Sequence, residues 1–235
     1  MRHQPAIFLH ARHVGRPPDL RFARAIDTRD RMNSTTLQTL LDEKAPLARI
    51  AEHLDGLTHE ERTAQAGSIG RAAQRKLWNL APTTGIDLEH FVPATLAPKQ
   101  PVRHIGRNTL PVPGPFRRFE KRFCAPETGR AEKLFGYNEG ITRGPLGPGF
   151  FVVHATAGNK LWEERGAIVV DYFDVPDSAV AEGWPKVIPN SQGLQKLVYF
   201  HTRDFMRKVS KHVSIGAAHK EEKPLDHYFT LVRES

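Results

Sequence analysis

The sequence has a single cysteine and no long apolar run. Because Cys124 stands alone, an intrachain disulfide and a thiolate cluster for zinc or iron–sulfur binding are both excluded. The densest apolar patches, residues 150–153 and 167–170, are far shorter than the roughly 18 residues that a membrane-spanning helix requires. The apolar stretch 6–9 is too brief for a secretory signal. We therefore expect a soluble, cytoplasmic protein without membrane spans.

Strong charge imbalance is missing from most of the chain. The formal net charge is +8, from 34 lysines and arginines against 26 aspartates and glutamates. Residues 1–31 hold seven arginines and three aspartates, and so supply half of the excess. The rest of the sequence is nearly balanced, and its charge does not favour a nucleic-acid partner.

Residues 1–31 also lack a sustained helical or strand period. Met32, in contrast, begins a stretch with capping hydroxyls followed by apolar residues at helical spacing. We interpret residues 1–31 as a disordered or non-native leader, and Met32 as the native initiator. A basic targeting arm is the alternative, which the scarcity of serine and the three aspartates disfavour.

Helical signals dominate residues 32–92. One helix is predicted to begin at Pro46, because proline suits the first helical turn. Thr58 and Glu61 have the spacing of a capping box, ahead of a helix expected to run toward Leu80. Residues 93–115 then contain six prolines, which predicts an extended or turning connector.

Residues 116–235 are predicted to mix strands with short helices and to share one core with the helical part. Phe116, Phe119 and Phe123 recur at helical spacing and predict an amphipathic helix. A further helix is expected from Leu194 to Val209, although 194–200 could also be a strand. Strands are expected at residues 150–156, 167–173, 212–218 and 227–232. The predicted class is α+β: N-terminal helices followed by a small, mostly antiparallel sheet with one further helix.

Polar residues in the connector and in the predicted loops are the candidates for a site. An imidazole near a carboxylate is suited to acid–base work, and a guanidinium to binding an anion. The same residues could instead attach the connector, cap a helix or form turns. The catalytic candidates are His104, His201 and Asp204, and the ligand-binding candidates are Arg107, Asn108, Asn138, Glu139 and Arg203.

The sequence indicates no metal site and identifies no cofactor. It has 12 histidines, but the one His-x-x-His pair, His10 and His13, falls within residues 1–31. The glycine-rich segment 140–149 lacks the lysine of a P-loop and the spacing of a dinucleotide-binding fingerprint.

Three functions remain open from the sequence. The favoured one is a binding domain for a small apolar ligand, enclosed by aromatic residues of a curved sheet, although the same aromatics would also fill an ordinary core. The second is an enzyme with an acid–base site of histidine, arginine and aspartate. The third is a protein–protein interaction module that uses the face at 116–123.

Overall fold

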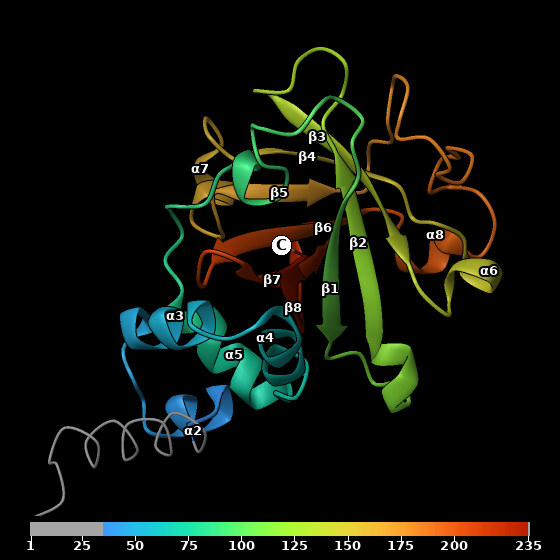
Figure 1. Ribbon diagram of the computed structural model, residues 1–235. Coiled ribbons are helices and arrows are strands. Elements are labelled where there is room, and N and C mark those ends of the chain that lie inside the picture. The colour runs from blue at the N-terminus through green and yellow to red at the C-terminus, as the bar shows by residue number, and fades with distance from the viewer. Residues whose placement is uncertain (1–34, 235) are drawn as a thin grey trace, which may run out of the picture. The chain divides into compact units, whose positions relative to one another are not determined.

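Eight antiparallel strands close into a barrel in the computed structural model, which describes residues 35–234 (Figure 1). They are β1 (Val102–Asn108), β2 (Arg118–Cys124), β3 (Lys133–Glu139), β4 (Phe151–Ala155), β5 (Ile168–Asp171), β6 (Thr202–Lys208), β7 (Val213–Lys220) and β8 (Lys223–Arg233). The strands pair in chain order, and β8 pairs with β1 to complete the circle. The interpretations of residues 1–31 and of Met32 lie outside the described residues.

The closed barrel shows that the predicted α+β class with a small sheet is wrong. The four expected strands are present as β4, β5, β7 and β8, and β4 pairs antiparallel with β5. The other four strands come from segments expected to be connector, helix or loop. Their hydrogen-bond partners lie elsewhere in the chain, so local propensity alone does not reveal them.

The predicted amphipathic helix at residues 116–123 is a strand, preceded by the 3-10 turn η2 (Gly114–Arg117). Phe116, Phe119 and Phe123 fit a helical spacing. However, Phe119 and Phe123 also fit a period of two, with Lys121 between them on the same face. Both neighbouring strands, β1 and β3, supply backbone partners for this segment, and this pairing decides in favour of the strand.

The predicted helix from Leu194 to Val209 is also wrong over most of its length. Only one turn, α8 (Gln195–Val198), is helical, and β6 begins at Thr202. This settles the open assignment of 194–200 as a short helix followed by a turn. Of the apolar residues that suggested a long helical face, Leu197 and Val198 lie in this turn, Phe205 lies on the outer face of β6, and Val209 follows that strand.

The N-terminal helices follow their local signals. The described helices are α2 (Leu37–Asp42), α3 (Leu47–Asp55), α4 (His59–Ala66), α5 (Arg71–Leu80), α6 (Arg143–Leu146), α7 (Lys160–Glu163), α8 and the 3-10 turn η1 (Leu88–His90). The capping box is confirmed, since Thr58 and Glu61 exchange side-chain to backbone hydrogen bonds. The helix expected to reach Leu80 is interrupted between Gly67 and Gly70, where glycine weakens the helix.

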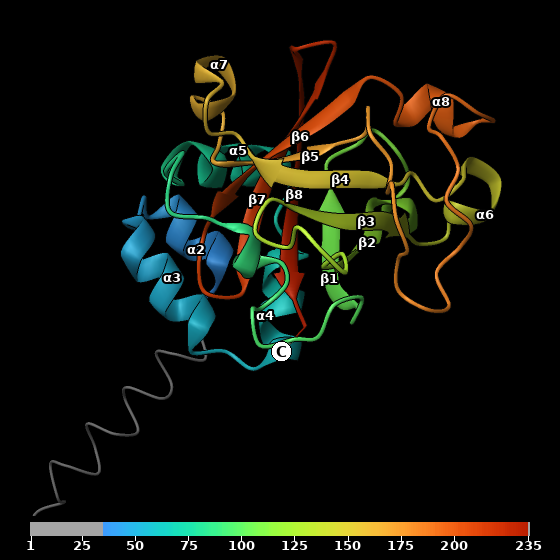
Figure 2. The same ribbon diagram turned by 90° about the horizontal axis from the view of Figure 1, so that it is seen from above.

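Two apolar clusters lie on opposite sides of the barrel wall. Outside, α4 and α5 pack on β7 and β8 (Figure 2). Phe205, Ile215 and Val232 point outward into this helical layer. Inside, a second cluster includes Phe123, Phe151 and residues of the η1 segment. The barrel interior is therefore a packed core over part of its length, with η1 among the residues that fill it.

Candidate functional site

A cluster of four polar side chains lies inside the barrel. Lys121 on β2, Asn138 on β3, Tyr172 directly after β5 and Asp204 on β6 are each between 2% and 7% exposed. Alternate residues of a barrel strand point inward, which brings these four from distant strands onto a common interior. We call these four residues the polar cluster.

Lys121 is the centre of the polar cluster. Its ammonium Nζ donates hydrogen bonds to Asn138 Oδ1 and Asp204 Oδ2, each at 3.1 Å, and to the Tyr172 hydroxyl. These three acceptors match the three donors of a lysine ammonium. Tyr172 also donates to Asp204 Oδ2 at 3.3 Å. The cluster thus contains a buried ion pair whose cation is fully hydrogen-bonded.

Aromatic rings surround this ammonium. The distances from Lys121 Nζ to the ring centroids are 4.8 Å for Phe151, 4.9 Å for Tyr172, 5.1 Å for Phe229 and 5.8 Å for Phe119. Rings at such distances attract a cation through their negative faces. The ammonium therefore lies in an apolar environment that nevertheless stabilises positive charge.

Tyr199 and Gly149 hold the cluster in place from the loops. The Tyr199 ring stacks on Tyr172 with centroids 5.3 Å apart. Gly149 has a φ of 52° and lies so close to Tyr199 that a Cβ would overlap its ring. The Gly149 carbonyl accepts a hydrogen bond from Asn138 Nδ2 at 3.0 Å. Glycine at this position allows both contacts.

Burial changes the acid–base properties of the cluster. It lowers the pKa of Lys121, although the Asp204 carboxylate opposes that shift. Burial raises the pKa of Tyr172 well above its ordinary value, and raises that of Tyr199 to about 12. Both phenols are therefore neutral at physiological pH, while Lys121 releases its proton more readily than an exposed lysine.

The polar cluster lies at the inner end of a cavity of about 360 Å³, which we call the mouth cavity. Its rim includes Phe116, Val198 and Leu225, which are 44%, 38% and 38% exposed. The short helices α6 and α8, which lie near each other in Figures 1 and 2, border the same opening. Other apolar side chains of its wall include Leu110, Val112, Phe119, Leu146 and Phe229. The wall of the cavity is thus largely apolar, and its buried end is polar.

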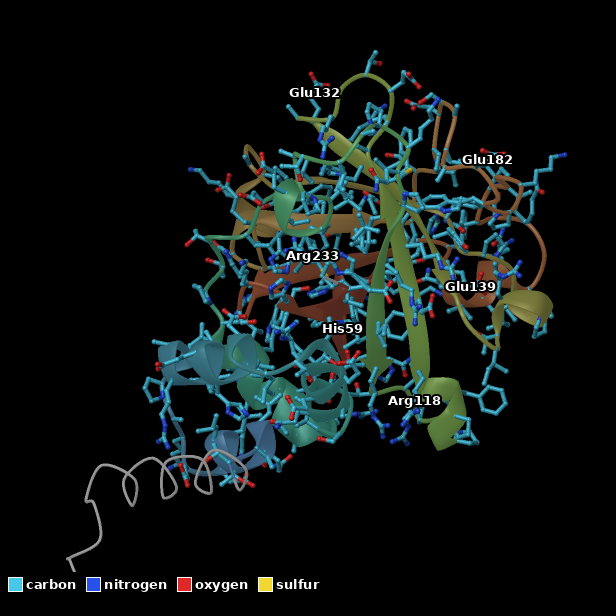
Figure 3. All side chains as sticks on the ribbon, viewed as in Figure 1. His59, Arg118, Glu132, Glu139, Glu182 and Arg233 are labelled. Atoms are coloured by element: carbon cyan, nitrogen blue, oxygen red, sulfur yellow. The ribbon has the colours of Figure 1, made fainter. Side chains whose placement is uncertain are left out.

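Four of the predicted site residues line the mouth cavity: Asn108, Asn138, Glu139 and Asp204. Asn138 and Glu139, expected in a loop, lie in β3. Glu139 lies near α6 (Figure 3), where Arg143 donates to its carboxylate at 2.7 Å. Only Asn138 and Asp204 of these four belong to the buried polar cluster.

His104 and Arg107 do not line the mouth cavity. His104 lies on β1 within the barrel core, stacked on Phe91 and in edge contact with Phe123. Its Nε2 lies 3.0 Å from the carbonyl of Phe91. Burial lowers the pKa of His104 to about 3, so the ring is neutral. Arg107 is on the opposite face of β1, where it lines a separate hollow of about 680 Å³.

His201 and Arg203 are also separated from Asp204, contrary to the acid–base arrangement considered from the sequence. Adjacent strand residues point to opposite faces, so Arg203 lies outside the barrel when Asp204 lies inside. Arg203 Nε donates to Asp171 Oδ2 at 2.7 Å. His201 precedes β6, and its ring stacks between Phe173 and Phe200.

Lys121 and Tyr172 were not among the predicted site residues. Lys121 lies in the segment predicted to be an amphipathic helix, and Tyr172 lies in the strand expected at residues 167–173, among the aromatics expected either to enclose a ligand or to fill the core. A period of two through Phe119, Lys121 and Phe123 would have placed the lysine on the apolar face. A lysine on such a face requires a buried partner, and this was the available signal.

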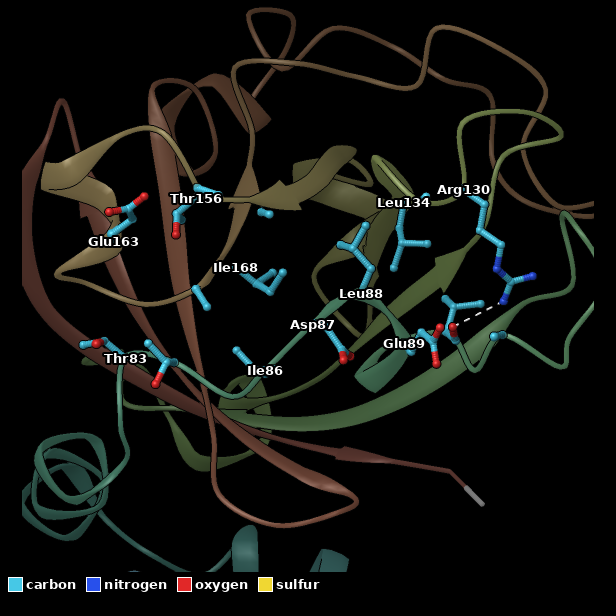
Figure 4. Close-up of a pocket in the computed structure, with 17 residues that line it drawn as sticks. Thr83, Ile86, Asp87, Leu88, Glu89, Arg130, Leu134, Thr156, Glu163 and Ile168 are labelled. Atoms are coloured by element: carbon cyan, nitrogen blue, oxygen red, sulfur yellow. Dashed lines mark hydrogen bonds between the residues drawn. The ribbon is translucent and has the colours of Figure 1, made fainter.

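A second hollow, of about 780 Å³, lies beside η1 and α7 (Figure 4). Ile86, Leu88 and Ile168 lie within it, with Glu163 and Arg130 to either side. Its polar groups serve the local structure: Arg130 donates to the Leu96 carbonyl at 2.5 Å, and other wall residues cap turns. The mouth cavity is therefore the better candidate, because charged side chains converge at its buried end.

Comparison of the chain with protein-family models, with curated protein sequences and with solved structures finds no match. Within residues 35–234, no group of three or more histidine, cysteine, aspartate or glutamate side chains is placed to hold a metal ion. None of the helices in that part of the chain has the length and apolar character needed to cross a bilayer. The fold and site define an antiparallel barrel with a charged cluster at the inner end of an apolar cavity.

Proposed function

We propose that the barrel binds a small, largely apolar ligand in the mouth cavity. The observation that carries this proposal is the convergence of the polar cluster at the buried end of an apolar opening. Ligand sites typically combine a mostly apolar wall with a few placed polar groups, in volumes of about 300–1,000 Å³. The mouth cavity, at about 360 Å³, falls in that range.

The two alternative functions have less support from the geometry. The acid–base site would need His201 and Arg203 beside Asp204, but both lie outside the barrel. The interaction module would need a continuous exposed aromatic face, but Phe123 is fully buried and Phe119 lines the cavity.

A cytoplasmic location belongs to the same proposal. Cys124 is buried, and burial raises the pKa of its thiol to about 11, which suits a structural thiol in a reducing compartment.

The test is displacement of a fluorescent apolar probe, anilinonaphthalene sulfonate, by n-octanol. Ala218 lines the mouth cavity, so Ala218→Trp fills it. Ala157 lines the hollow beside η1, so Ala157→Trp is the matched control. We expect n-octanol to compete with the probe in the wild type and in Ala157→Trp, and to lose this effect in Ala218→Trp. Competition that survives Ala218→Trp and disappears in Ala157→Trp would assign binding to the other hollow and reject the proposal.

A further inference from the structure

We infer that Lys121 is the nucleophile of a carbonyl site and forms an imine with an apolar aldehyde or ketone held in the mouth cavity. This inference rests on the proposed ligand-binding function. Of the described residues that line the cavity, Lys121 is the one lysine. A primary amine within an apolar cavity is the group that reacts reversibly with a carbonyl carbon.

The neighbours of Lys121 supply the required proton transfers. Asp204 Oδ2 lies 3.1 Å from Nζ and is placed to accept a proton from the ammonium. The Tyr172 hydroxyl contacts Nζ and lies 3.3 Å from the same carboxylate oxygen. It is therefore placed to pass a proton between the carbonyl oxygen and Asp204. Both groups line the cavity in which the carbonyl would lie.

The reaction balances without an oxidant or a reductant. The Lys121 ammonium gives one proton to Asp204, and the free amine attacks the carbonyl carbon, whose π electrons move to oxygen. That oxygen takes up protons from the nitrogen and from Asp204 and leaves as water, while the nitrogen lone pair forms the C=N bond. Ammonium and carbonyl thus give a protonated imine and one water. The positive charge is retained opposite Asp204.

The surroundings of Lys121 favour this reaction over a purely structural ion pair. Burial lowers the pKa of Lys121, so its neutral amine forms more readily than that of an exposed lysine. The rings of Phe151 and Phe229, within 5.1 Å of Nζ, would stabilise the protonated imine as they stabilise the ammonium. The apolar wall limits the access of water that would hydrolyse the product.

The experiment uses octanal with sodium borohydride, which reduces an imine to a stable secondary amine. Peptide mapping by mass spectrometry then measures the octyl group at each lysine, and the exposed Lys160 and Lys186 serve as internal controls. Because the cavity holds the aldehyde beside Nζ, we expect labelling of Lys121 to be about tenfold or more faster than at those lysines.

Two variants test Lys121 as the nucleophile and Asp204 as the proton acceptor separately. Lys121→Arg keeps a cation but has no nucleophilic amine, so the labelling of this position should disappear. Asp204→Asn keeps a hydrogen-bonding group but removes the proton acceptor, so labelling of Lys121 should slow while labelling of Lys160 is unchanged.

The n-octanol competition assay distinguishes the two proposals. If n-octanol binds in the mouth cavity but Lys121 is labelled no faster than Lys160, the carbonyl site is rejected and the binding function stands. If neither n-octanol nor octanal occupies the cavity, both proposals fail. Preferential labelling of Lys121 that octanol suppresses supports both.

Discussion

Lys121 is a buried cation of the barrel interior and depends on its polar partners. It is 2% exposed and shares a buried ion pair with Asp204. Lys121→Met would leave that carboxylate buried without a cation, so we expect the free energy of unfolding to fall by about 3–5 kcal/mol. The measurement is urea denaturation. Lys76, which forms an exposed pair with Asp42, gives the control: Lys76→Met should change stability by about 0.5 kcal/mol or less.

A double variant separates the loss of attraction from the cost of the unpaired charge. Lys121→Met combined with Asp204→Leu removes both ions and replaces them with apolar groups. Because such replacements of a buried pair are often neutral or stabilising, the double variant should be more stable than Lys121→Met alone. Additive losses from the two substitutions would contradict the view that the pair acts as a unit.

Gly136 on β3 provides a second residue-level test. A Cβ at this position would lie 2.5 Å from the Arg122 carbonyl oxygen and would overlap the ring of Phe151. Gly136→Ala should therefore lower the free energy of unfolding by about 1–3 kcal/mol, as overpacking does. Gly114→Ala is the control, since no heavy atom lies within 4 Å of a Cβ there. Equal effects in the two variants would show that the interior can relax around the added methyl group.

The site was only partly predictable at this scale. Asn138 and Asp204 were found as polar residues, because polarity is visible in the sequence. Lys121 was missed since its apolar neighbours fit a helix as well as a strand, and only strand pairing fixes which side faces inward. The grouping of His201 with Asp204 depended on the same choice. Three residues apart, they would share one face of a helix, whereas in the structure His201 precedes β6 and Asp204 points into the barrel.

At the scale of elements, the capping box of α4 is the local signal with the clearest energetic consequence. The Glu61 amide donates to Thr58 Oγ1 at 3.3 Å, and the Thr58 amide donates to Glu61 Oε2 at 2.9 Å. Thr58→Ala removes one of these bonds and should cost about 1 kcal/mol of unfolding free energy. Thr84→Ala, in an exposed turn, should leave stability nearly unchanged. A loss of similar size in both variants would contradict a specific capping effect.

The elements that could be predicted are those whose stabilising contacts are close in sequence. The start of α4 depends on residues three positions apart, and β4 and β5, both expected as strands, pair across the connection that contains α7. β1 and β2 gave no such signal. Proline-rich sequence surrounds β1, yet the prolines at 101 and 111 lie outside the strand and leave its backbone donors free.

Closure of the barrel exists only at the scale of the whole molecule. His104 on β1 pairs with Arg233 on β8, at the far end of the described chain. No pattern within either segment indicates this partner, because pairing of distant strands is decided by the barrel as a unit. The same closure encloses the core around His104, so the protonation of His104 is linked to global unfolding.

As the pH falls, the protein should therefore begin to lose stability at a higher pH than protonation of its carboxylates alone would cause. Burial lowers the pKa of His104 to about 3, and that of His90 well below its ordinary value. In the unfolded chain each returns to about 6.5. Between these values the unfolded state binds more protons than the folded state, so stability falls as the pH falls. Each such histidine contributes a slope of about 1.4 kcal/mol per pH unit in that window.

The substitution His104→Phe removes one of these titrations and keeps an aromatic ring beside Phe91 and Phe123. We expect its free energy of unfolding to fall less steeply than that of the wild type between pH 6 and pH 4, by about 1.4 kcal/mol per pH unit. His154 gives the opposite sign at higher pH, because the Asp171 carboxylate, 4.0 Å from its Nε2, raises its pKa. It adds stability as the pH falls through that raised pKa to about 6.5 and a constant amount below it, so His154→Phe should lose this gain above about pH 6.5 and leave the slope between pH 6 and pH 4 unchanged. Urea unfolding at stepped pH measures both slopes, and identical slopes in His104→Phe and the wild type would mean that His104 does not titrate on unfolding.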